Sequence, residues 1–232
     1  MCWIIVLTKN QTLEKSKFQN AWRNNNDGAG FMYAKDKQLF IEKGFVDFDS
    51  FWESYKDIPE DITRIVHFRK ISVGDNIADN HHPFYVNNGL GFAHNGTILG
   101  IKDYTKDEEK KFSDTYLFNE KILKPLVRRQ CNLIHFSKDI QWLISRAILT
   151  DKIVFLNKYG KTIIINAEKG HWNTEKTIWT SGLSHTWEPF KQTTHYPAST
   201  AGYSNGVSKG SPLGLNKVDD SKVIPYDTWL TK

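Results

Sequence analysis

The first residues of the chain form an unbroken apolar segment, and this segment constrains the fold more than any other. Residues 2–7 read CWIIVL, and Thr8 follows them. A strand with one face in water alternates apolar and polar residues, whereas a strand covered on both faces is apolar throughout. We therefore predict a strand over residues 2–8 that is buried on both faces. The segment is much shorter than the ~18 residues of a membrane span and lacks the features of a signal peptide, so we expect no membrane association.

The composition fits one folded domain followed by a tail. Of the 232 residues, 39% are apolar, 13% are aromatic and 25% are charged, which is enough apolar material for one core. The net charge is +5, and no segment is basic enough to predict a nucleic-acid surface. The two cysteines, Cys2 and Cys131, are too few for a disulfide framework. We expect a cytoplasmic protein that binds no nucleic acid.

The order of the predicted elements indicates a layered α+β domain. Helices are predicted over residues 13–23, 47–55, 113–129 and 136–149, with Pro125 kinking or ending the third. Strands are predicted over residues 31–34, 38–42, 62–68, 90–93, 153–157, 162–166 and 177–180. Strands thus precede and follow a pair of neighbouring helices, which favours α+β layers over a doubly wound sheet. We place the domain at residues 1–190 and a flexible Ser/Gly/Pro-rich tail at residues 191–232.

Cys2 is the first candidate for chemistry. If Met1 is removed, Cys2 becomes the terminal residue and carries both a thiol nucleophile and an α-amine. A terminal amine has a pKa near 8, which suits a general base close to neutrality, and such amines activate weak nucleophiles. The alternative is that Cys2 is merely the first apolar residue of a strand.

Further candidates follow the later predicted strands. Asn95 and Gly96 lie in the segment FAHNGT and could form an oxyanion hole from a side-chain amide and a backbone N–H, or merely a tight turn. Arg69 and Ser72 end another strand, where a guanidinium suits a carboxylate or is a surface charge. Asp114 begins the third helix, where its ordinary role is to favour the helix start.

Taken together, these residues form one ordered series. The series consists of Met1-Cys2 with Ile4-Ile5, the segment NDGAGF at 26–31, His67-Phe68-Arg69 with Ser72 and Gly74, HPF at 82–84, AHNGTI at 93–98 and SDT at 113–115. In this order the motifs resemble those of class II glutamine amidotransferases, members of the N-terminal nucleophile hydrolase superfamily. The resemblance covers residues 2–118 and continues as general architecture to about residue 190. It implies a four-layer αββα sandwich with Cys2 at the end of a central strand.

The resemblance also implies roles for individual residues. Cys2 would attack the side-chain amide of glutamine and form a thioester, while Asn95 and Gly96 stabilise the oxyanion. Arg69 and Ser72 would hold the α-carboxylate of the substrate, and Asp114 its α-ammonium group. His82 is counted with the substrate-binding residues and would shape the loop rather than transfer protons. No cofactor and no metal are implied.

The sequence departs from the family at two places. Trp3 stands where the family usually has a glycine after the nucleophile. After Arg69 the family commonly has an aromatic residue and a Thr-His pair, whereas Lys70, Ser72 and Val73 occupy this stretch here. Ser72 keeps a hydroxyl, but the missing aromatic residue puts in doubt any loop closure or ammonia channel like that of the large synthases.

Several alternatives remain open. A metal could be held by a set of histidines with Cys2, although no Cys-x-x-Cys or His-x-x-x-His spacing supports such a site; the residues are Cys2, His67, His81, His82 and His94. A nucleophile hydrolase could act on another γ-glutamyl or acyl-amine substrate, and the chain could be a non-catalytic interaction module. Within the glutaminase interpretation, the ammonia passes to a separate synthase subunit, or the protein acts as a stand-alone glutaminase.

Overall fold

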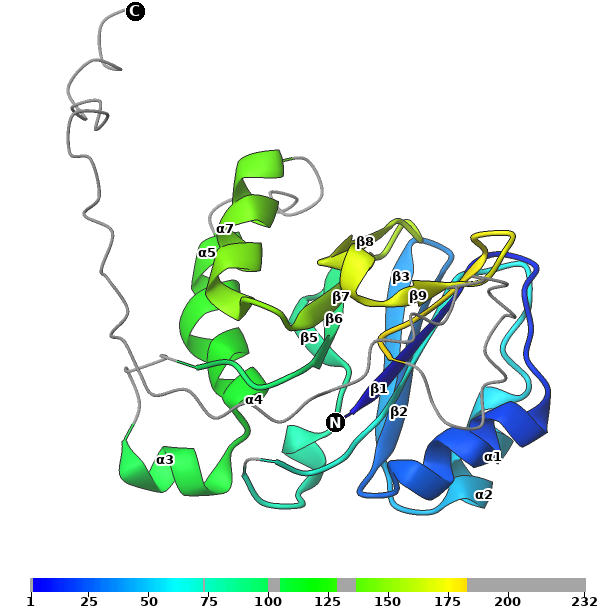
Figure 1. Cartoon of the computed structure of the whole chain (residues 1–232), viewed down its shortest axis with the longest axis horizontal. Helices are drawn as coiled ribbons and strands as arrows, with labels where there is room; N and C mark the ends of the chain where they lie inside the picture. The colour runs from blue at the N-terminus through cyan, green and yellow to red at the C-terminus, as the bar shows by residue number, and fades with distance from the viewer. Residues whose placement is uncertain (1, 73, 100–104, 129–136, 183–232) are drawn as a thin grey trace, which may run out of the picture. The chain divides into compact units, whose positions relative to one another are not determined.

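Two antiparallel sheets and two groups of helices make up the described part of the chain. The computed structural model describes residues 2–72, 74–99, 105–128 and 137–182 (Figure 1). The larger sheet has the order β3-β2-β4-β1-β10-β9, with bounds Gln38–Phe45, Ala29–Lys35, Arg64–Phe68, Trp3–Leu7, Ile178–Thr180 and His171–Trp172. The smaller sheet has the order β5-β6-β7-β8, with bounds Phe84–Asn87, Leu90–Asn95, Lys152–Asn157 and Thr162–Ile165. The predicted α+β class is confirmed.

Strand β1 is buried on both faces, as its continuous apolar sequence predicts. Trp3, Ile5 and Leu7 pack in one cluster with residues of α1 (Lys15–Asn24) and α2 (Phe48–Tyr55). The side chains between them, Ile4 and Val6, point the other way and meet residues of the smaller sheet. Because side chains alternate along a strand, each face of β1 contributes to a different part of the core.

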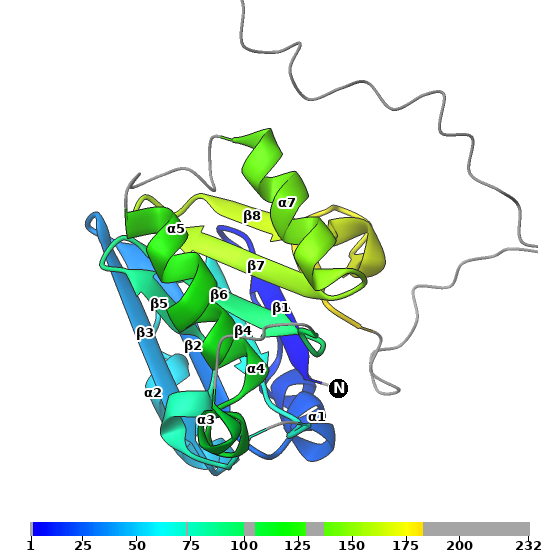
Figure 2. The same cartoon turned by 90° about the vertical axis from the view of Figure 1, so that its left-hand side faces the viewer.

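The helices cover the outer faces of the two sheets. Helices α1 and α2 lie against the larger sheet (Figure 1). The remaining helices and helical turns are α3 (Lys106–Lys111), α4 (Asp114–Phe118), α5 (Lys124–Arg128), α7 (Lys138–Ile148), η1 (Ala78–Asn80), η2 (Asn119–Leu123) and η3 (Ala167–Lys169). Of these, α4, α5 and α7 lie on the side of the smaller sheet (Figure 2). Together with η2 they supply apolar side chains to a cluster with that sheet. The core between the sheets contains Met32, Ile65, Val154 and Trp179.

Local sequence signals explain several element ends. Asp47 accepts a hydrogen bond from the Ser50 amide at 2.8 Å and caps α2, and Ser113 caps α4 in the same way. Asp36 and Lys37 both have positive φ, as the tight turn between β2 and β3 requires. These ends agree with the predicted starts of the helices over residues 47–55 and 113–129 and with a turn between the strands predicted over residues 31–34 and 38–42.

The helical segment that contains Pro125 continues past the proline to Arg128, within the predicted range of residues 113–129. Of the two effects predicted for Pro125, a kink or an end of the helix, the end is therefore wrong. Proline has no N–H and its ring clashes with the preceding turn of a regular helix. Here the wider turn of the π-helix η2 directly precedes α5, and this extra residue per turn accommodates the ring.

Some elements were missed, and one prediction lies outside the described residues. The short strands β5 and β9 and the polar helix α3 carry too little apolar periodicity to be predicted from sequence. The tail predicted at residues 191–232 falls outside the described residues. None of the helices in the described part of the chain has both the length and the apolar character needed to cross a membrane.

Candidate active site

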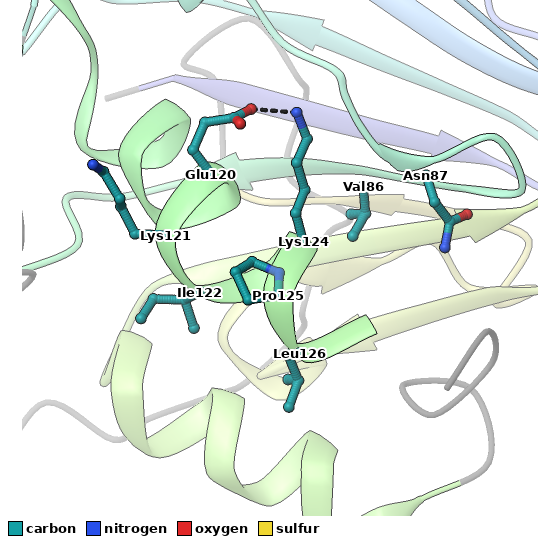
Figure 3. Close-up of a pocket in the computed structure, with 8 residues that line it drawn as sticks. All are labelled: Val86, Asn87, Glu120, Lys121, Ile122, Lys124, Pro125 and Leu126. Atoms are coloured by element: carbon teal, nitrogen blue, oxygen red, sulfur yellow. Dashed lines mark hydrogen bonds and ion pairs between the residues drawn. The ribbon is translucent and has the colours of Figure 1, made fainter. Parts of the chain in front are cut away.

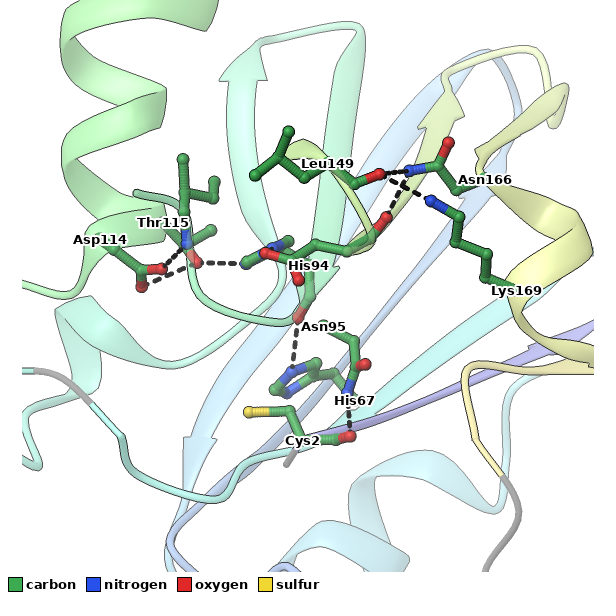
Figure 4. Close-up of polar contacts among 11 residues, drawn as sticks. Cys2, His67, His94, Asn95, Asp114, Thr115, Leu149, Asn166 and Lys169 are labelled. Carbon is green, nitrogen blue, oxygen red and sulfur yellow. Dashed lines mark hydrogen bonds and ion pairs between the residues drawn. The ribbon is translucent and has the colours of Figure 1, made fainter. Parts of the chain in front are cut away.

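The antiparallel sheet brings the candidate residues together at one end of β1. Trp3 of β1 pairs with Phe68 of β4, so Cys2, just before β1, lies beside the segment that follows β4. The last residue of β6, Asn95, donates a hydrogen bond from Nδ2 to the carbonyl oxygen of Cys2 (Figure 4). One small pocket results, lined by Cys2, Arg69, Lys70, Ser72, His82, His94, Gly96, Ser113, Asp114 and Thr115. It therefore contains every residue predicted for the site except Asn95, which lies next to it.

The thiol of Cys2 is held by the backbone of Lys70. The thiol donates to the carbonyl oxygen of Lys70 at 3.3 Å, and the amide of Lys70 donates to Sγ at 3.4 Å. Burial raises the pKa of the Cys2 thiol, while the Lys70 hydrogen bond and the positive charge of Arg69 act in the opposite direction. Because burial is the larger effect, the thiol is protonated near neutral pH and needs a base to become a nucleophile.

Arg69 is buried and holds the loop that follows β4. Its guanidinium donates to the carbonyl oxygen of Asp75 at 3.3 Å and to Oδ1 of Asn76 at 3.2 Å. Only 3% of the residue is exposed, yet it lines the pocket beside Cys2. An arginine in this position links the loop to the pocket, and any carboxylate that binds here meets a charged donor that is already oriented.

Asp27 fixes the residues next to the thiol. Its Oδ2 accepts a hydrogen bond from the amide of Ile71 at 2.8 Å and forms an ion pair with Nζ of Lys70 at 3.5 Å. The amide of Asp27 also donates to the carbonyl oxygen of Arg69. The segment around Asp27 therefore supports the same stretch of backbone that contacts Sγ of Cys2.

The glycines of the NDGAGF motif allow a close approach of the loop that carries His81 and His82. A Cβ at Gly28 would lie 2.4 Å from the His81 ring, and Gly28 has a φ of +149°. A Cβ at Gly30 would lie 2.2 Å from the carbonyl oxygen of His82. Only glycine permits both contacts, so this motif shapes one wall of the site.

Asp114 joins the start of α4 to the loop after β6. Its Oδ2 accepts a hydrogen bond from the amide of Ile98, and Thr115 donates its hydroxyl to Oδ1 at 3.4 Å. Asp114 nevertheless lines the pocket together with Cys2 and Arg69. A carboxylate and a guanidinium thus line the same pocket, an arrangement complementary to the two charges of a free amino acid.

Three histidines near the site are buried, namely His67, His81 and His82, and the last of them lines the pocket. The ring of His82 lies 4.1 Å from that of His67 and 4.7 Å from that of Phe84, measured between centroids. Burial lowers the pKa of His67 to about 3 and that of His81 to about 4, and it lowers the pKa of His82 well below its ordinary value. These rings are therefore neutral at pH 7. Within the described residues, no group of three or more His, Cys, Asp or Glu is arranged to hold a metal ion.

The buried histidines predict a loss of stability in mild acid. Their folded-state pKa values are lower than in the unfolded chain, so the unfolded state binds more protons below about pH 6.5. Stability is then fully present above that pH and falls as the pH decreases towards the folded values of about 3 to 4. Each such histidine contributes about 1.4 kcal/mol per pH unit in this range. Urea unfolding between pH 7 and pH 5 measures the slope.

Matched variants identify the histidines responsible. His82→Phe retains a ring against Phe84 and should reduce the pH slope of the free energy of unfolding by about 1.4 kcal/mol per pH unit, the contribution of one proton. His171→Gln, at an exposed position, should leave this slope unchanged. If the wild-type free energy of unfolding is independent of pH over this interval, the histidines are not buried in the neutral form.

The pocket at Cys2 is nearly closed in this structure. Its free space corresponds to about one water molecule, which is too little for an amino acid. A substrate must therefore displace some of the contacts described above. The sequence predicts Arg69 and Asn95 as substrate and oxyanion donors, whereas in this state their donors are used by the loop at Asp75 and by the Cys2 carbonyl.

A second, larger hollow lies on another part of the molecule. It is lined by Val86, Asn87, Glu120, Lys121, Ile122, Lys124, Pro125 and Leu126 (Figure 3). Its charges are paired: Lys124 with Glu120, and Lys121 with Glu108. Its described lining contains no cysteine, histidine or aspartate, and its two lysines are held in these ion pairs, so the pocket at Cys2 is the better candidate for catalysis.

Comparison with known proteins shows a likeness of fold to solved structures. No family model matches the chain, and no curated protein matches its sequence. Among solved structures, the fold is similar to glutamine phosphoribosylpyrophosphate (PRPP) amidotransferase from B. subtilis complexed with ADP and GMP, with a TM-score of 0.52 at 15% identity. The match covers 78% of this chain and 41% of that chain. The likeness is one of fold.

Sequence reasoning missed two contributors to the site. The backbone of Lys70 contacts the thiol, but a backbone contact leaves no signal in the residue type. Asp151 contacts His94 through its carboxylate, although 57 residues separate the two. It directly precedes β7, and no motif surrounds it.

Proposed function

We propose that residues 1–190 form a glutamine amidotransferase domain of class II that hydrolyses the side-chain amide of glutamine. One observation carries the proposal: Cys2, Arg69 and Asp114 line a single pocket at the end of a central strand. The fold's similarity to an amidotransferase supports it. On this proposal the domain is a four-layer αββα sandwich of the N-terminal nucleophile hydrolase type.

The proposed reaction has two steps. The α-amine of Cys2, once Met1 is removed, takes the thiol proton, and Sγ bonds to the amide carbon of glutamine. The tetrahedral intermediate collapses, the C–N bond breaks, and the amine returns the proton to the departing ammonia. Water then hydrolyses the γ-glutamyl thioester, which releases glutamate and regenerates the thiol.

Two groups are proposed to stabilise the oxyanion. Gly96 lines the pocket, and the Asn95 side chain is held beside Cys2 by its hydrogen bond to the Cys2 carbonyl. Rotation of the Asn95 side chain would exchange this acceptor for the oxyanion. Donors in a dry site stabilise developing charge strongly, because they need little reorganisation.

The α-groups of glutamine are proposed to bind Arg69, Ser72 and Asp114. Arg69 would exchange the Asp75 carbonyl for the substrate carboxylate, and Asp114 would receive the α-ammonium group. His82 would keep the loop in place as a neutral ring. No cofactor or metal has a part in this scheme.

Asn95→Ala and Arg69→Ala should separate chemistry from binding. Losing one oxyanion donor should lower kcat by about 10²–10³-fold with little change in KM. Losing Arg69 should mainly raise KM, since the substrate carboxylate is bound in the ground state and in the transition state alike. Steady-state glutamate release measures both, and Arg69→Lys retains the charge as a control. Equal effects of the two substitutions on both parameters would show that the roles are misassigned.

Substrate choice tests the proposal as a whole. Glutamine should be hydrolysed in preference to a γ-glutamyl anilide and to a simple primary amide that lacks the α-groups. Preference for the anilide would favour the alternative of an amide hydrolase with another γ-glutamyl substrate. If none of the three amides is cleaved and the thiol reacts with no glutamine-like electrophile, the result would favour the alternative that the chain is a non-catalytic interaction module.

The proposal also covers what happens to the ammonia that the reaction releases. The chain spans about two fifths of the length of the amidotransferase it is similar to. We propose that the ammonia passes to a separate synthase; a stand-alone glutaminase is the alternative. Adding candidate acceptor enzymes to the glutaminase assay and measuring aminated product distinguishes the two.

A further inference from the structure

The turn between α7 and β7 has an unfavourable backbone conformation. Leu149 has a φ of +54° and a ψ of −103°, a combination that side chains other than glycine rarely adopt. Its side chain is 63% exposed, so packing of the leucine does not explain the strain. A strained residue persists where surrounding contacts fix it, and the contacts of this turn are therefore informative.

Two residues that follow β8 hold the turn. The carbonyl oxygen of Leu149 accepts hydrogen bonds from Nδ2 of Asn166 at 3.0 Å and from Nζ of Lys169 at 2.8 Å. The carbonyl oxygen of Asp151 accepts a further one from Nδ2 of Asn166 at 2.7 Å. Figure 4 shows both donors directed at the turn. The turn is thus fixed from outside, and its last residue is Asp151.

The carboxylate of Asp151 reaches the backbone of the candidate oxyanion hole. A Cβ added at Gly96 would lie 1.9 Å from Cγ of Asp151, so the carboxyl group packs directly against this glycine. Oδ2 of Asp151 lies 3.3 Å from Nε2 of His94. Gly96 itself has a φ of +144°, a conformation that side chains other than glycine rarely adopt.

The other side of His94 is fixed as well. Nδ1 of His94 lies 2.8 Å from Oγ1 of Thr115, and its carbonyl oxygen accepts a hydrogen bond from Nε2 of His67 at 3.2 Å. Both ring nitrogens of His94 thus face a polar partner, Nε2 the carboxylate of Asp151 and Nδ1 the hydroxyl of Thr115. The side chain of His94 is only 1% exposed. Residues 94–96 are therefore held between Asp151 on one side and Thr115 and His67 on the other.

We propose that Asp151 is a positioning residue that fixes the backbone of residues 94–96 and so directs the Gly96 amide towards the pocket, and that Asn166 and Lys169 act through it. The inference rests on the proposed function, because the Gly96 amide matters as an oxyanion donor only if an amide is attacked at Cys2. Asp151 is not among the residues lining the pocket. Its effect is exerted through Gly96 and His94.

Asp151→Ala should lower kcat for glutamine at least about tenfold and leave KM within about twofold, since small displacements of catalytic groups cost up to about a hundredfold in rate. Asp151→Asn retains the shape and an oxygen acceptor for His94, and should restore most of the rate. Glu168→Gln, at an exposed carboxylate near Lys169, is the matched control and should match the wild type. Thermal unfolding shows whether each variant is folded at the assay temperature.

A double-mutant cycle tests the action through Asp151. Asn166→Ala should lower kcat in the wild-type chain but have little further effect in the Asp151→Ala background. Additive losses would show that Asn166 acts independently. An Asp151→Asn variant that is folded and as slow as Asp151→Ala would likewise overturn the positioning role.

A readout independent of catalysis separates this inference from the proposed function. The amide resonance of Gly96 should shift and exchange faster in Asp151→Ala, and return towards its wild-type position in Asp151→Asn. If the wild-type chain releases no glutamate, the proposed function fails, while the Gly96 amide still tests the positioning. An unchanged Gly96 amide in a folded Asp151→Ala protein would rule out the inference whatever the activity.

Discussion

Cys2→Ala is expected to abolish glutamate release while the chain remains folded and binds glutamine. Loss of an enzyme nucleophile lowers kcat on the order of 10⁶-fold, which is below detection in a glutamate assay. The fold should tolerate the change, because Cys2 lies before β1 and the hydrogen bonds of its thiol to the backbone of Lys70 are long, at 3.3 and 3.4 Å. Arg69 and Asp114 remain in place, so calorimetry should still detect glutamine binding.

The chain's other cysteine supplies the control. Cys131→Ala should retain wild-type activity, and a glutamine-like electrophile should add one equivalent to the wild type and to Cys131→Ala but none to Cys2→Ala. Cys2→Ser should retain the fold with little activity, since an alcohol is far harder to deprotonate than a thiol. Glutamate release by Cys2→Ala at a rate comparable to the wild type would exclude Cys2 as the nucleophile.

The central strand shows what could be predicted of the fold. A continuous apolar run predicts burial on both faces, and β1 contributes Ile5 to one cluster and Ile4 to another. Helix caps such as Asp47 and Ser113 can also be inferred from sequence, because capping depends on a side chain and the backbone amides a few residues away. Strands β5 and β9 cannot be inferred in this way, because two to four residues carry no measurable period and their pairing depends on partners far along the chain.

In the candidate site too, features set by local sequence could be predicted, whereas features set by contacts far along the chain could not. The motifs around Cys2, Arg69, Gly96 and Asp114 could be found because each joins a chemical group to a local turn or cap. Their meeting in one pocket depends on the antiparallel pairing of β1 with β4, which sequence patterns do not specify. Asp151 had no such signal. Its contact with Gly96 arises from the sheet register and from a turn that Asn166 and Lys169 hold.

Retention of Met1 is expected to reduce glutamine hydrolysis by about 10²–10⁴-fold, the usual contribution of a general base. Burial raises the pKa of the Cys2 thiol, so the thiol is protonated near neutral pH and has to lose its proton during attack. The histidines His67, His81 and His82 are poor bases, since burial lowers their pKa values far below neutrality. A free α-amine on Cys2 is the base best matched to the working pH, whereas an amide nitrogen in a peptide bond has no basic lone pair.

A removable leader isolates this effect. The chain is produced with an N-terminal extension whose cleavage leaves Cys2 as the first residue, and intact mass identifies the cut and uncut forms. The cut form should release glutamate, and the uncut form should be nearly inactive although every side chain of the site is present. Thermal unfolding of both forms excludes a difference in folding, and Cys2→Ala with the same leader gives the background rate.

The pH dependence of the cut form provides a second check on the same base. Activity should rise with pH as the amine loses its proton, with an apparent pKa near that of a terminal amine, about 7.7–8.0. The same rise should be seen in the Asp151→Asn variant, which alters position rather than the base. If the uncut chain hydrolyses glutamine as fast as the cut chain, then the amine is not the base, and Cys2 acts as an internal cysteine rather than as an N-terminal nucleophile.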